Sequence, residues 1–199
     1  MQLLNNNVIV KFDESHNKTF NIGAIDLVRP DTWVFDELNT GETQYQKQYD
    51  LRQTMPQIAT IKVSNKRCDE LKEGDMVFTH YLAFDTSEVI KIGEEDYRTV
   101  GLGSILFKIL SNGEIKPMDD NYLGEEVFEE EEVTASGIIL SAFGSRKKRS
   151  MIKITHIPEN SPYVKVGDVV YTIDDNQYTL DFLGKKYIKL NTWHIVAKA

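Results

Sequence analysis

A repeated segment constrains the fold of this chain more than any other feature. The residues LKEGDMVFT at 71–79 recur as VKVGDVVYT at 164–172, an offset of 93 residues. At the same offset, IATIKVSN from Ile58 parallels MIKITHIP from Met151 in its alternation of apolar and polar residues. Because repeated order at a fixed spacing marks duplicated structural units, the sequence predicts two copies of one fold.

Both copies have the two-residue period of β-strands. Short runs rich in Val, Ile, Tyr and Phe are separated by Gly, Asn, Asp or Pro, and long helical periodicity is scarce. The clearest runs begin at Val8, Ile58, Asp75, Met151 and Asp168. Short, closely spaced strands of this kind are typical of an all-β barrel or sandwich.

Each copy contains a Lys-x-Gly-Asp segment, which ends at Asp75 in the first and at Asp168 in the second. The glycine can adopt a turn conformation that a Cβ atom disfavours, and the aspartate can accept hydrogen bonds from nearby backbone amides. The segment therefore predicts a tight turn that leads into the next strand. Downstream, the aligned pairs are Gly93 with Gly184 and Tyr97 with Tyr187.

Composition excludes several function classes. The net charge of −8 opposes nucleic-acid binding, which depends on neutralising phosphates with Lys and Arg. The apolar runs are far shorter than the roughly 18 residues that span a bilayer, which predicts no membrane segment. The N-terminal residues show no secretory pattern, and Cys68 is the single cysteine. We therefore expect a cytoplasmic protein without disulfides.

The order of elements in the second half resembles a GroES-type co-chaperonin of the chaperonin-10 family. It runs from IKPMDD at Ile115 through GIIL at 137–140 and VKVGDVVY at Val164 to a closing WHIVA at Trp193. The first half is similar more loosely, with LNNNVIVK at Leu4 and GAIDL at 23–27. The short stretches before the two Gly-Asp turns resemble phage-type members with a reduced roof hairpin.

The resemblance implies an all-β fold of two tandem GroES-like β-barrels. The first barrel would cover 1–109 with an extended loop at 13–57, and the second 110–199 with a loop at 129–150. The offset between the copies changes from 114 at Gly23 and Gly137 to 93 further on, so residues 31–56 contain an insertion of about twenty residues in the first copy.

The function implied is that of a co-chaperonin that caps a GroEL-type chaperonin ring through mobile apolar loops and assists ATP-dependent protein folding. Such a protein is no enzyme, needs no cofactor and forms a homo-oligomeric ring, whose stoichiometry stays open for a chain with two barrels. The residues that would bind the chaperonin are Gly137, Ile138, Ile139 and Leu140 in the second loop, and Gly23, Ala24, Ile25 and Leu27 in the first.

The alternative for Gly137 to Leu140 is a buried strand, but the Gly- and Ser-rich flanks favour a docking loop. In the first copy Asp26 interrupts the apolar tripeptide, so the sequence does not decide between a docking loop and a buried strand there. Together with the aromatic residues of the insertion, Asp26 also motivates a second hypothesis. The chain would then be a structural protein, such as a virion or scaffold component, that uses GroES-like barrels without binding a chaperonin.

Other candidate sites have simpler explanations. The acidic run at 129–132 lacks the interleaved glycine and spacing of a calcium loop, and the four histidines have no zinc spacing, so no metal site is predicted. The basic run at 146–149 is expected to be a solvated loop. Nucleophile-elbow, phosphate-binding and dinucleotide-binding motifs are missing, which leaves no recognised catalytic set.

Overall fold

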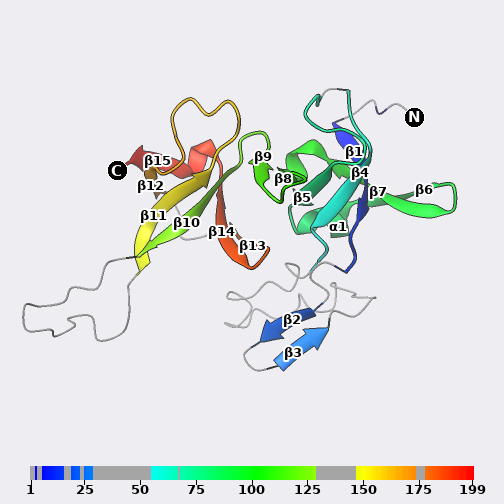
Figure 1. Ribbon diagram of the computed structural model, residues 1–199, viewed down its shortest axis with the longest axis horizontal. Helices are drawn as coiled ribbons and strands as arrows, with labels where there is room; N and C mark the ends of the chain where they lie inside the picture. Colours follow the sequence, from blue (N-terminus) through cyan, green and yellow to red (C-terminus); the bar gives the residue numbers. More distant parts are fainter. Residues whose placement is uncertain are drawn as a thin grey trace, which may run out of the picture. The chain divides into compact units, whose positions relative to one another are not determined.

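The computed structural model describes residues 3, 6–15, 19–22, 25–28, 55–66, 68–128, 147–173 and 178–199. The chain divides into two compact units, Met1–Glu114 and Ile115–Ala199, a few residues beyond the expected boundary at 109/110. The described residues are predominantly antiparallel β-strands (Figure 1), which confirms the all-β prediction. No helix in the described part of the chain is long and apolar enough to cross a membrane.

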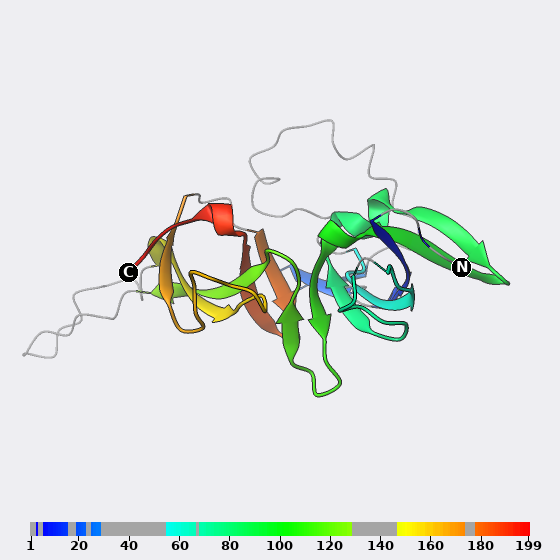
Figure 2. The same cartoon turned by 90° about the horizontal axis from the view of Figure 1, so that it is seen from above.

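The first sheet has seven strands. From one edge to the other its strands are β6 (Glu88–Ile92), β7 (Glu95–Gly101), β1 (Asn7–Phe12), β4 (Ile58–Val63), β5 (Met76–Thr79), β8 (Ile105–Ile109) and β9 (Ile115–Pro117). The β6–β7 hairpin extends away from the rest of the sheet in both views (Figures 1 and 2). One helical turn, α1 (Leu82–Thr86), precedes β6, and a 3-10 turn, η3 (Leu102–Ser104), precedes β8.

The second unit contains a six-stranded sheet. Its order is β13 (Tyr178–Phe182), β14 (Lys185–Leu190), β10 (Tyr122–Phe128), β11 (Lys147–His156), β12 (Val169–Thr172) and β15 (Ile195–Lys198). A 3-10 turn, η4 (Thr192–His194), precedes β15 in the same way that η3 precedes β8. The strand predicted from Met151 begins earlier, at Lys147, because Phe128 of β10 pairs with Lys147 and lengthens the ladder.

Six strands occupy the same relative places in both sheets. When these six are numbered in chain order within each unit, the spatial order is 4-5-1-2-3-6 in the first sheet and again in the second, with β9 added beyond the sixth in the first. Within the part of the chain that the structure describes, no pairing joins the two outer strands of either sheet. The observed fold is therefore two antiparallel sheets of matching strand order.

The registers of the central strands also correspond. Ala59 of β4 lies opposite Val77 of β5, and Ile152 of β11 lies opposite Val170 of β12. Each residue of the second pair follows its counterpart by the same 93 residues that separate the repeated sequence segments. The correspondence thus extends from strand order to individual residues.

The pairing of the first and second strands is irregular at matching places in the two sheets. In β1 the register to β4 shifts between Ile9 and Val10, and in β10 the register to β11 shifts between Leu123 and Gly124. In each case the extra residue lies in the second strand, Lys62 in β4 and Thr155 in β11, as in a β-bulge, which bends a strand and increases its twist. Along the first strands the two shifts are 114 residues apart, which matches the offset of the two predicted loops that follow these strands.

Each sheet buries its own apolar residues. In the first, Phe78 of β5 and Phe107 of β8 are fully buried and stack with ring centroids 4.7 Å apart. In the second, a contiguous cluster is formed by Tyr122, Ile152, Ile154, Val164, Val170, Ile188 and Leu190. Burial of such side chains contributes about 1.5–3 kcal/mol each to folding, so each sheet has a core of its own.

The hairpins β6–β7 and β13–β14 correct one detail of the sequence alignment. Tyr97 and Tyr187 occupy matching places, each the third residue after its turn, as predicted. Gly93, however, corresponds to Leu183 and not to Gly184. In the first turn only Gly93 has a positive φ, whereas Leu183 and Gly184 both do in the second. The two hairpins use different two-residue turns, which require glycine at different positions.

Candidate functional site

The Lys-x-Gly-Asp segments form the predicted turns in both units. Gly74 has φ +89° and Gly167 has φ +92°, a conformation that side chains disfavour. The backbone N–H of Gly74 donates a hydrogen bond to a carbonyl of β4 at 2.9 Å, and that of Gly167 donates to a carbonyl of β11 at 2.8 Å. These bonds attach each turn to the second strand of its sheet, so the turn predicted from sequence is confirmed.

The aspartates of these turns have matching partners. Asp75 Oδ2 accepts a hydrogen bond from the backbone N–H of Lys72 at 2.7 Å, and Asp168 Oδ2 accepts one from that of Lys165 at 2.8 Å. The prediction that the aspartates bind nearby backbone amides is therefore confirmed.

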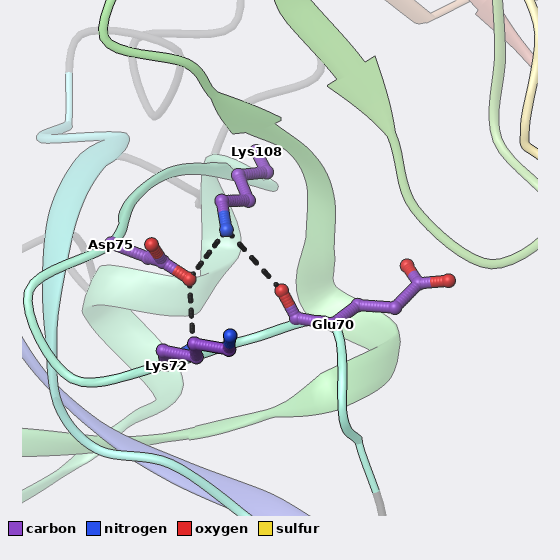
Figure 3. A network of polar contacts seen from close by, with 4 residues as sticks. All are labelled: Glu70, Lys72, Asp75 and Lys108. Atoms are coloured by element: carbon purple, nitrogen blue, oxygen red, sulfur yellow. Dashed lines mark hydrogen bonds and ion pairs between the residues drawn. The ribbon is translucent and has the colours of Figure 1, made fainter.

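A lysine from the sixth strand completes each turn. Lys108 Nζ lies 2.6 Å from Asp75 Oδ2 and donates a second hydrogen bond to the carbonyl oxygen of Glu70 at 3.3 Å (Figure 3). In the second unit Lys198 Nζ lies 2.6 Å from Asp168 Oδ2. Each ion pair joins a turn to a strand that is distant in sequence, so no local pattern predicts either lysine.

The environment of Asp75 lowers the pKa of its carboxyl group. Burial acts to raise that pKa, but the hydrogen bonds from Lys108 and from the Lys72 amide and the two lysine charges together outweigh it. For Asp168 the largest cause is the hydrogen bond from Lys198, which lowers the pKa, followed by the Lys165 amide. Both turns are therefore stabilised when the carboxylate is ionised.

This network predicts a pH-dependent loss of stability in Asp75→Asn. The substitution removes a charged partner of Lys108, and we expect it to cost about 1–2 kcal/mol at pH 7. Because the folded pKa lies below the unfolded value of about 3.9, the wild-type advantage is present above that value. It is lost as the pH falls through the folded pKa.

Urea unfolding of the wild type and Asp75→Asn at pH 7, 5 and 3 measures this difference. Glu70→Gln is the matched control, because Glu70 contacts Lys108 through its backbone carbonyl only. An Asp75→Asn effect that is as large at pH 3 as at pH 7 would contradict the assignment.

The predicted loops leave the two sheets at corresponding places. The first lies between β1 and β4, and the second lies between β10 and β11, which in both sheets is the connection from the first strand to the second. The described part of the second connection ends at Phe128 and resumes at Lys147, and these two residues pair with each other. The ends of the second loop are therefore held side by side by a strand pair.

Most of the predicted chaperonin-binding residues lie outside the described residues, namely Gly137, Ile138, Ile139, Leu140, Gly23 and Ala24. Ile25 and Leu27 lie in β3 (Ile25–Val28), which pairs with β2 (Thr19–Ile22) in a separate two-stranded sheet. The segment expected as an extended loop at 13–57 thus contains a β-hairpin, in which Ile22 is opposite Ile25 and Phe20 is opposite Leu27.

The expected solvated loop at 146–149 needs a correction. Residues 147–149 belong to β11, so the loop predicted at 129–150 is shorter at its C-terminal end. The acidic run at 129–132 lies outside the described residues. Within the described ranges, no group of three or more His, Cys, Asp or Glu residues is placed to hold a metal ion.

Sequence reasoning also missed a group of exposed apolar residues beside β15. Trp193, Val196, Ile173 and Tyr171 are 67%, 63%, 65% and 43% exposed, and they lie on β12, on β15 or next to them. Alternation marks Val196 and Tyr171 as strand residues but does not tell which strands have a neighbour on both sides. The corresponding residues of the first copy, Leu106 and Phe78, have the same alternation and are buried, so no signal in the sequence marks Val196 and Tyr171 as exposed.

No model of a known protein family matches the chain, and no curated protein matches it.

Proposed function

We propose that this protein is a co-chaperonin built on two diverged copies of a GroES-like barrel, which caps a chaperonin ring and assists ATP-dependent protein folding. The observation that carries the proposal is that both predicted docking loops connect the first and second strands of sheets with the same strand order. The resemblance in motif order and the identical Lys-x-Gly-Asp turns support the same conclusion. The proposal has no catalytic step and needs no cofactor.

The contacts with the chaperonin come from short apolar segments. Ile138, Ile139 and Leu140 are the anchors of the second loop, and Ile25 and Leu27 are those of the first. A buried aliphatic side chain contributes about 1.5–3 kcal/mol, from which the cost of ordering the loop is subtracted. Each loop therefore binds weakly. Several loops on one assembly bind together through their effective concentration, which gives a cap that is tight and still releasable.

Binding of Ile139→Asp to a chaperonin tests the proposal. The variant loses an anchor in every copy of the chain, and we expect its affinity to fall about tenfold to a hundredfold for each loop engaged. Complex formation with a GroEL-type ring, with and without ATP, is measured by native gel and light scattering. Ser145→Asp is the matched control, since it adds the same charge in the polar flank of the same loop.

Two results separate the alternatives. If Ile139→Asp binds as well as the wild type, the assignment of the second loop is wrong. If the wild type forms no nucleotide-dependent complex, the structural-protein hypothesis replaces the co-chaperonin. Ile25→Asp, measured in the same assay, tells whether the first loop also binds.

A further inference from the structure

Two of the histidines in the described residues use the ring nitrogen Nδ1 as a hydrogen-bond acceptor. His80 Nδ1 accepts a hydrogen bond from the backbone N–H of Leu82 at 3.2 Å, and His194 Nδ1 accepts one from that of Asn191 at 2.8 Å. Because a backbone N–H can only donate, each ring must keep a lone pair on Nδ1. Both bonds therefore require the neutral imidazole, with its proton on Nε2.

Each of these bonds holds the start of a helical turn. Leu82 is the first residue of α1, and the first N–H groups of a helix have no partner within it. Asn191 is the N-cap of η4 and forms a capping box with His194, in which each side chain accepts the backbone N–H of the other residue. The imidazole thus takes the part that the side chain of Asn or Asp has in most helix caps.

The two turns lie at the same junction in both units. The backbone N–H of His80 donates to the carbonyl of Ser104 in η3 at 2.8 Å, and that of Ile173 donates to the carbonyl of His194 in η4 at 3.0 Å. His80 and Ile173 are 93 residues apart, and each directly follows the third strand of its sheet. The junction therefore joins the end of the third strand to the turn before the sixth, and each unit has one histidine there.

A carboxylate and an ammonium group contact the turn in the second unit. Asp120 accepts hydrogen bonds from the backbone N–H and the hydroxyl of Thr192, and Lys189 Nζ donates to the side chain of the N-cap. These two charges act on the imidazole in opposite directions, which leaves the bond at Nδ1 as the deciding contact. The rings of Tyr81 and Trp193 lie beside the two histidines, with centroids 4.3 and 3.5 Å away.

We propose that His80 and His194 make these two turns acid-sensitive, so that protonation of the rings opens the junction between the third and sixth strands in each unit. A protonated imidazole carries a hydrogen on Nδ1, which would face the backbone N–H and abolish the hydrogen bond. In the second unit the uncapped η4 would then release β15, the strand that follows it. The inference does not rest on chaperonin binding, since it concerns contacts within one chain.

His156 has the opposite arrangement. Its Nδ1 lies 3.0 Å from the hydroxyl oxygen of Thr155, and that hydroxyl donates its own hydrogen to the carbonyl of Leu123 at 3.1 Å. Nδ1 of His156 is therefore the donor, as it would also be in a protonated ring. Acid leaves this bond intact, which makes His156 a matched control within the same chain.

Urea unfolding of the full chain between about pH 7.5 and 5.5 tests the proposal. An ordinary histidine titrates near pH 6.5, so the stability from the two bonds is fully present above that pH and is lost as the pH falls below it. For the unit that contains each turn, the unfolding equilibrium constant is expected to rise by up to about tenfold over this range. Asp75 and Asp168, whose carboxyl pKa values are lowered, stay ionised throughout.

His80→Asn and His194→Asn separate the charge from the hydrogen bond. The side-chain oxygen of the asparagine can accept the same backbone N–H and does not titrate. In each variant the acid-induced rise should be smaller by up to about tenfold, whereas His156→Asn should keep the pH dependence of the wild type. A variant at 80 or 194 with the pH dependence of the wild type would overturn the proposal.

Nuclear magnetic resonance of the wild type, labelled with nitrogen-15 in its histidines, gives a test that requires no variant to be stable. At about pH 7.5 the rings of His80 and His194 are expected to carry their proton on Nε2, and the ring of His156 is expected to carry one on Nδ1. A proton on Nδ1 of His80 or His194 at this pH would overturn the proposal. Chaperonin binding is measured separately, so either proposal can fail alone.

Discussion

Gly124→Val is expected to destabilise the second sheet by about 3 kcal/mol, a large part of the stability of a typical domain. Gly124 lies in β10 at the register shift, and a Cβ atom there would be 2.3 Å from Ile152 Cγ2 and 2.8 Å from the carbonyl oxygen of Lys153. Ile152 is fully buried, and the second obstacle is backbone, so neither can move easily. Urea unfolding measures the loss.

The corresponding positions in the first sheet explain why a glycine is tolerated here. By the registers above, Gly124 corresponds to Val10 and Ile152 corresponds to Ala59. All four residues are buried. One sheet therefore combines a valine with an alanine, and the other combines a glycine with an isoleucine. The larger side chain lies on the first strand in the first sheet and on the second strand in the second sheet.

This exchange of volume predicts a rescue. Ile152→Ala alone should cost about 2–5 kcal/mol through the cavity it creates. Combined with Gly124→Val it restores the pair found in the first sheet, so the double variant should lose about 0.5–3 kcal/mol less than the sum of the single variants. Gly103→Ala is the control, because a Cβ atom at Gly103 meets nothing within 4 Å. Gly124→Ala adds the Cβ atom alone and should cost more than Gly103→Ala. Equal losses in these two variants, or a double variant that loses the full sum of its single losses, would contradict the close contact between residues 124 and 152.

Local patterns in the sequence were sufficient to predict the main strands and the turns that the two copies share. Alternation located β1 and β4, and the Lys-x-Gly-Asp segments located turns whose glycines have positive φ. These features depend on residues a few positions apart. The one-residue error at Gly93 arose because two hairpins of equal length can place their glycine differently.

Long-range features could not be predicted in this way. Lys108 and Asp75 meet through the pairing of β5 and β8, and nothing near either residue indicates the contact. Val196 is exposed and Leu106 at the corresponding place is buried, although both lie in the same alternating pattern. For the candidate site, the two loops were predicted from the sequence, whereas the strand ends from which they start are known from the structure.

Phe78→Ala is expected to cost about 3–5 kcal/mol, the second large effect. Phe78 and Phe107 are both 0% exposed, and their rings are nearly parallel, with an interplanar angle of 8°. The substitution leaves a cavity beside Phe107 and removes a stacked contact that itself contributes about 0.5–1.5 kcal/mol. Denaturant unfolding of Phe78→Ala, Phe107→Ala and the double variant measures both quantities. A double variant that loses the full sum of the single losses would show that the stacked contact contributes nothing.

Tyr171→Ala is the matched variant in the second sheet. Tyr171 occupies the place of Phe78 but is 43% exposed, and its cross-strand partner Ala197 occupies the place of Phe107. We expect a loss of less than about 1 kcal/mol in the unfolding of the single chain, because truncation there leaves little cavity. Urea unfolding of Tyr171→Ala and Phe78→Ala under the same conditions measures the difference between the two sheets. Equal losses would contradict the expectation that the exposed place packs more loosely than the buried one.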